Sequence, residues 1–151
     1  MKITRYIVVS ILSGLVLFSL GCVKQTLTDK QLLQEIQIFL DTPYDPDNPD
    51  LLTPEERSYV SSYSIFHNIL KVQLVDDTPQ EFRKPIAAKM VKHFALTRRE
   101  LGVLEQVYRL QLFVRLEVDR ERSNFHIADA RFENRTERVI VEEYAATRSR
   151  R

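Results

Sequence analysis

Residues 108–118 read YRLQLFVRLEV, and this stretch decides the fold. Polar side chains, among them Arg109, Gln111 and Arg115, alternate along it with apolar ones, and only Phe113 interrupts the pattern. A period of two is typical of a strand that buries one face. The apolar positions that define the buried face are Leu110, Leu112, Val114, Leu116 and Val118. The sequence therefore predicts a long strand here.

Two weaker strands are predicted after it, at residues 125–132 and 138–147. The intervening residues 133–136, ENRT, are typical of a hairpin turn. Consecutive strands joined by short turns form an antiparallel meander. We therefore expect an antiparallel sheet of about three to four strands in the C-terminal half of the chain.

Helices are predicted before this sheet. Four segments fit the capping box, in which a threonine caps a helix and Glu or Gln follows three residues later; they begin at Thr28, Thr53, Thr78 and Thr97. Helical spacing predicts an amphipathic helix to about residue 41 and a largely buried helix after Thr53. For residues 70–75, helix and strand remain open alternatives. Pro85 indicates that the helix after Thr78 starts near residue 84 or is kinked there. The expected fold class is α+β, with N-terminal helices packed on the C-terminal sheet.

The first 21 residues have the pattern of an export signal. Lys2 and Arg5 precede a mainly apolar run from residue 7 to residue 20, which is shorter than the roughly 20 residues of a membrane-spanning helix. The run ends in FSLGC at residues 18–22, which resembles the lipobox of bacterial lipoproteins. The alternatives are an ordinary cleaved signal with an incidental cysteine, or an uncleaved anchor helix.

The lipobox resemblance implies cleavage between Gly21 and Cys22, diacylglycerol on the Cys22 thiol and an acyl chain on its amine. Val23, in place of Asp, implies delivery to the outer membrane, with the domain facing the periplasm. Residues 22–26 would then be a short acylated tether, residues 27–147 a single α+β domain and residues 148–151 a basic tail. No cofactor is expected beyond these covalent lipids.

Composition excludes several classes of function. The net charge is +1, and −1 without Lys2 and Arg5, so no nucleic acid is expected as a partner. A single cysteine excludes a disulfide framework and a cysteine-built metal site. Gly102 is the only glycine after the signal, which argues against a glycine-rich phosphate loop. The three histidines lack metal-ligand spacing and no serine stands in a Gly-x-Ser-x-Gly elbow, so neither a metal site nor an enzyme is predicted.

Two regions are candidates for binding a partner. Asp45, Asp47 and Asp50 lie in a proline-stiffened loop, for which calcium coordination and a simple solvated loop are the alternatives. Arg109 and Arg115 belong to a C-terminal region whose basic residues are all arginines, suited either to an anionic partner or to cross-strand ion pairs.

These patterns favour a lipid-anchored, non-enzymatic binding or assembly component of a cell-envelope complex. It would have the membrane and an envelope protein as its partners. The alternative is a carrier or sensor of a lipid or glycan, with an apolar groove between residues 108–118 and the helices. A small hydrolase is the third hypothesis.

Overall fold

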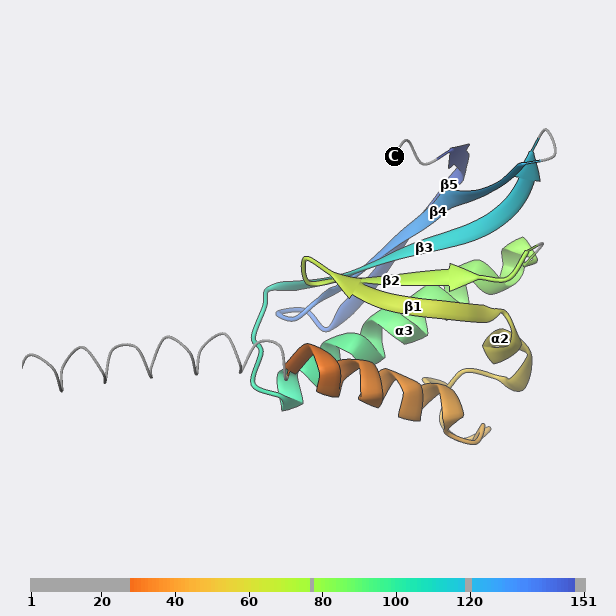
Figure 1. Ribbon diagram of the computed structural model, residues 1–151. Helices are drawn as coiled ribbons and strands as arrows, with labels where there is room; N and C mark the ends of the chain where they lie inside the picture. Colours follow the sequence, from red (N-terminus) through yellow and green to blue (C-terminus); the bar gives the residue numbers. More distant parts are fainter. Residues whose placement is uncertain (1–27, 77, 119–120, 149–151) are drawn as a thin grey trace, which may run out of the picture.

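The protein is an α+β structure in which helices cover one face of a five-stranded sheet (Figure 1). The computed structural model describes residues 28–76, 78–118 and 121–148. The expected signal segment, the lipidation site at Gly21 and Cys22, the tether and residues 149–151 of the basic tail lie outside the described residues. The α+β class predicted from the sequence is confirmed.

The sheet follows chain order but is mixed rather than antiparallel. Neighbouring strands pair antiparallel except β2 and β3, which run parallel because helix α3 (Gln80–Glu100) crosses between them. The expectation of three to four antiparallel strands is therefore corrected to five strands with one parallel pair. The strands are β1 (Val60–Phe66), β2 (Ile69–Leu74), β3 (Val107–Val118), β4 (Glu121–Glu133) and β5 (Arg138–Arg148).

The prediction of a largely buried helix after Thr53 was wrong. Only α2 (Pro54–Ser58) is helical, and β1 and β2 then form a hairpin, so residues 70–74 are strand. His67 and Asn68 make the two-residue turn, with φ of 48° and 64°. Such primed turns match the twist of paired strands, and Asn tolerates the left-handed conformation well. Serine, aromatic and β-branched residues dominate β1, which disfavours a helix there.

The structure confirms some of the predicted capping boxes and not others. At α2 the box is complete, with Glu56 N donating to Thr53 Oγ1 at 3.1 Å and Thr53 N donating to Glu56 Oε2 at 2.7 Å. At α3 the N-cap is Pro79 without a side-chain cap, while Thr97 lies inside the helix. The helix predicted after Thr78 is therefore present but lacks the threonine cap, whereas the start predicted at Thr97 was wrong; α3 includes Pro85 rather than beginning near it. The first helix extends through residue 41, as predicted.

The core lies between the helices and one face of the sheet. The first helix contributes Leu32 and Ile36, α3 contributes Met90 and Phe94, and the strands contribute the alternating apolar residues seen in the sequence. Tyr108, Leu110, Leu112 and Val114 of β3 are fully buried. Figure 1 shows no helix of the described chain on the opposite face of the sheet. This open face of the sheet is therefore the first place to look for a functional site.

Candidate functional site

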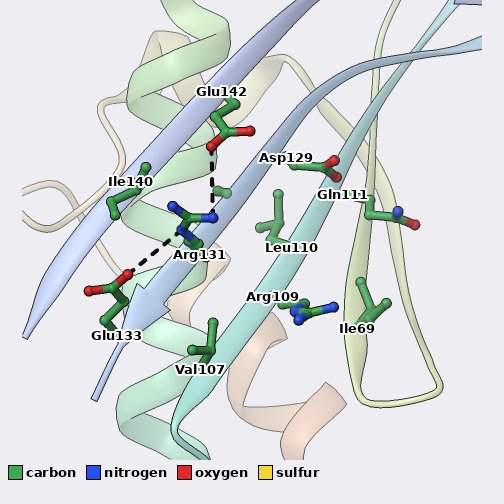
Figure 2. A pocket seen from close by; sticks show the side chains of 11 residues that line it. Ile69, Val107, Arg109, Leu110, Gln111, Asp129, Arg131, Glu133, Ile140 and Glu142 are labelled. Carbon is green, nitrogen blue, oxygen red and sulfur yellow. Dashed lines mark ion pairs between the residues drawn. The ribbon is translucent and has the colours of Figure 1, made fainter. Parts of the chain in front are cut away.

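The open face of the sheet contains a shallow depression of about 460 Å³ over β3, β4 and β5 (Figure 2). Side chains at alternate strand positions line it. Ile69, Arg109, Arg131 and Ile140 form one row across four strands, because each pairs with the next in the sheet register. The adjacent row contains Gln111, Asp129 and Glu142. The depression is thus charged at its centre and apolar at its flanks.

The two arginines of this site have different surroundings. Arg131 lies between two carboxylates: its Nε is 3.8 Å from Glu133 Oε1 and its Nη1 is 3.8 Å from Glu142 Oε1. Arg109 stands directly opposite Arg131 on the neighbouring strand. Within the described chain, no carboxylate lies within ion-pair distance of Arg109. The site therefore presents one neutralised and one unneutralised guanidinium side by side.

A β-bulge brings a second set of polar groups to the same face. The register between β3 and β4 shifts so that Leu112 pairs with Ala128 and Phe113 with His126. Without the extra residue in β4, His126 and Asp129 would point to opposite faces of the sheet. With it, His126 Nε2 lies 2.8 Å from Asp129 Oδ1, and the imidazole stacks on Phe113 at 5.1 Å between ring centroids.

Tyr144 of β5 completes this polar cluster. Its hydroxyl donates to Asp129 Oδ2 at 3.0 Å and lies 3.5 Å from Glu142 Oε2. The hydrogen bond to Asp129 raises the pKa of Tyr144 above its usual 10.0, with desolvation and the charges of Asp129 and Glu142 acting in the same direction. The phenol therefore remains a hydrogen-bond donor at neutral pH.

The acidic loop lies apart from these arginines, beside the helices. Asp45 Oδ1 accepts from the Asp47 backbone N–H at 3.0 Å, and Asp50 Oδ2 lies 2.6 Å from Lys92 Nζ of α3. Arg115 is on the open face but outside the depression, with its Nε 3.5 Å from Asn124 Oδ1. Of the five predicted partner-binding residues, only Arg109 lines the depression.

The histidines occupy three different settings. His67 lies in the β1–β2 turn. His93 of α3 stacks on Phe39 at 4.1 Å, and burial lowers its pKa below 6.5, partly offset by Glu35 and Glu100. His126 belongs to the polar cluster. Among the described residues, no three His, Cys, Asp or Glu side chains converge as a metal site.

Sequence reasoning missed Asp129, Arg131, Glu142 and Tyr144. The signal was present in part, because these residues occupy polar positions of the two weaker predicted strands. Their convergence depends on the β4 bulge and on the β4–β5 register, which the hydrophobic pattern alone does not fix. The groove expected between residues 108–118 and the helices is occupied by core side chains, since Tyr108, Leu110 and Leu112 are fully buried there.

Comparisons with protein-family models, curated proteins and solved structures find no match to this chain. In the described ranges, no helix is long and apolar enough to cross a membrane.

Proposed function

We propose that this protein is a lipid-anchored component of a cell-envelope complex that binds an acidic segment of a partner protein on the open face of its sheet. The observation that carries the proposal is the pair formed by Arg109 and Arg131, directly opposite each other with only Arg131 neutralised. Arg131 is already paired with Glu133 and Glu142, so an incoming carboxylate would pair with the guanidinium of Arg109, which has no carboxylate of its own.

The rest of the depression suits a peptide or protein surface. Ile69 and Ile140 flank the arginines and offer apolar contact, while Gln111 supplies both a donor and an acceptor. Asp129 and Glu142 place negative charge in the adjacent row. A partner segment with a basic residue next to its acidic one would therefore bind in one orientation. An open, shallow surface of mixed polarity is typical of a protein interface rather than of an enclosed small-molecule pocket.

The lipid anchor would place this face close to the membrane that bears the partner. Cys22 precedes the first described residue, Thr28, by only six positions, a span of at most about 20 Å when fully extended. Acylation with two or three chains gives nearly permanent attachment. The protein would thus act at the periplasmic surface of the outer membrane.

Position-specific photo-crosslinking tests this proposal in the cells that naturally produce the protein. A photoreactive side chain at Gln111, in the depression, should give a discrete adduct that disappears when Arg109→Glu is added. The matched control is the same group at Gln34, which is exposed on the first helix and away from the sheet face. Adducts that form equally at Gln34, or that persist unchanged with Arg109→Glu, would contradict the assignment of the binding face.

A further inference from the structure

We infer that the end of the domain formed by residues 101–106 and the β1–β2 turn rests on the bilayer, with Leu104 inserted among the lipid headgroups. This inference rests on the proposed lipid anchor. Leu104 is 77% exposed, more than the other large apolar side chains of the described chain, and Phe66 beside the β1–β2 turn follows at 55%. Leu104 lies in the segment between α3 and β3, and Phe66 is the last residue of β1 before its turn.

Hydrogen bonds on both sides of Leu104 fix the conformation of this segment. α3 ends in a Schellman motif, with Gly102 N donating to the Arg99 carbonyl and Val103 N donating to the Arg98 carbonyl at 2.8 Å. Tyr108 then fixes both neighbours of Leu104: its hydroxyl donates to the Val103 carbonyl at 2.5 Å and accepts from Glu105 N at 3.1 Å. Leu104 therefore points outward because the residues on each side of it are tied to the core.

The position of this end agrees with the position of the expected anchor. Figure 1 shows the start of the first helix, the segment between α3 and β3, and the β1–β2 turn at the same end of the domain. Cys22 lies at most about 20 Å of extended chain from Thr28, so an acylated Cys22 would hold this end of the domain near the membrane. The loop that contains Tyr44 lies at the opposite end, beyond the first helix.

The chemistry around Phe66 also fits a lipid surface. Lys71 Nζ lies 4.7 Å from the centroid of the Phe66 ring, so an aromatic side chain and an ammonium are presented together. Aromatic rings and lysines with apolar stems are favoured at the boundary between headgroups and acyl chains. Two such contacts in addition to the acyl chains would fix the orientation of the domain and thus the direction in which the open sheet face looks.

Tryptophan fluorescence tests this orientation, because the natural chain contains no tryptophan. The full-length acylated protein would carry Leu104→Trp and be reconstituted into phosphatidylethanolamine and phosphatidylglycerol vesicles with brominated acyl chains. We expect a blue-shifted emission that bromine quenches about twofold, as for a side chain at the acyl boundary. Phe66→Trp should respond in the same direction. The matched control is Tyr44→Trp, which is 41% exposed at the opposite end and should show neither effect.

The outcomes separate this inference from the function on which it rests. If the protein floats with the vesicles but the tryptophan at position 104 is no more quenched than the one at position 44, the membrane-facing end is wrong and the anchor stands. A blue shift without quenching by brominated lipid would indicate that protein covers Leu104, and would also overturn the inference. Failure of the full-length protein to float would overturn the lipid anchor and the inference together.

Discussion

Arg98 Nη2 lies 2.6 Å from Glu105 Oε1, and this ion pair ties the end of α3 to the segment that leads into β3. The Arg98 side chain is 4% exposed and the Glu105 side chain 29%. The guanidinium carbon also lies 5.4 Å and 5.9 Å from the ring centroids of Phe94 and Tyr108. A nearly buried cation is thus compensated by one carboxylate and two aromatic rings.

Glu105→Ala should therefore lower the free energy of unfolding by about 2 to 3 kcal/mol, because it leaves the buried Arg98 charge unpaired. The Arg98 Nε and Nη1 atoms already lack hydrogen-bond partners among the described residues, so nothing nearby replaces the lost carboxylate. Urea denaturation followed by circular dichroism measures the change.

The matched control for this pair is Arg99→Ala, in the next position of α3. Arg99 Nη1 lies 3.2 Å from Glu137 Oε1, but their side chains are 34% and 67% exposed. An exposed pair of this kind contributes about 0 to 1 kcal/mol. Equal losses in the two variants would mean that burial does not govern the Arg98 pair.

Gly102→Ala should destabilise the protein by about 1 kcal/mol through backbone strain alone. Gly102 has a φ of +81°, and a Cβ built on it would meet no atom within 4 Å, so a steric clash makes no contribution. Gly102→Asn should cost less than Gly102→Ala, because asparagine tolerates the left-handed region better. Thermal unfolding of the two variants ranks them, and the reverse ranking would indicate that contacts rather than φ dominate.

The sequence predicted the α+β class and the central strand correctly because β3 has one buried face and an alternation that only Phe113 interrupts. It failed at residues 59–69, where apolar side chains also fit helical spacing, and it left helix and strand open for residues 70–75. The turn at His67 and Asn68 overrides that spacing, since β1 and β2 pair across it and bury Leu70, Val72 and Leu74 against β3. The capping-box pattern, a threonine with a glutamate three residues later, was also ambiguous. Tertiary packing made Thr53 an N-cap but placed Thr97 inside α3.

Of the candidate site, the sequence could predict only the residues of one strand, β3. Alternation alone placed Arg109 on the solvent side of β3, but its opposite neighbour Arg131 follows from the strand register. The bulge that turns His126 toward Asp129 has a faint sequence counterpart in Phe113, which interrupts the alternation and lies on the open face under the imidazole. Such long-range pairing is decided by the whole sheet and leaves little trace in a local window.

His93 should make stability depend on pH. Burial lowers the pKa of its imidazole below the ordinary 6.5, so between those two values the unfolded chain binds more protons than the folded one. The contribution of neutral His93 is complete above about pH 6.5 and is lost as the pH falls toward the folded pKa. Urea unfolding across this range should show a smaller pH slope in His93→Gln than in the natural protein. An unchanged slope in His93→Gln would contradict the assignment.

Arg109→Gln should weaken partner binding without lowering the free energy of unfolding. Because Arg109 faces Arg131 without a carboxylate of its own, its removal relieves cross-strand repulsion, and the free energy of unfolding should stay constant or rise by about 0.2 to 0.5 kcal/mol. The same variant should weaken photo-crosslinking from Gln111, because the partner carboxylate loses the unneutralised guanidinium. Arg115→Gln, six positions along β3 and outside the depression, is the control and should leave crosslinking intact. A loss of stability of more than about 1 kcal/mol in Arg109→Gln would show that Arg109 serves the fold rather than a partner, since an exposed charge without a partner has no stabilising contact to lose.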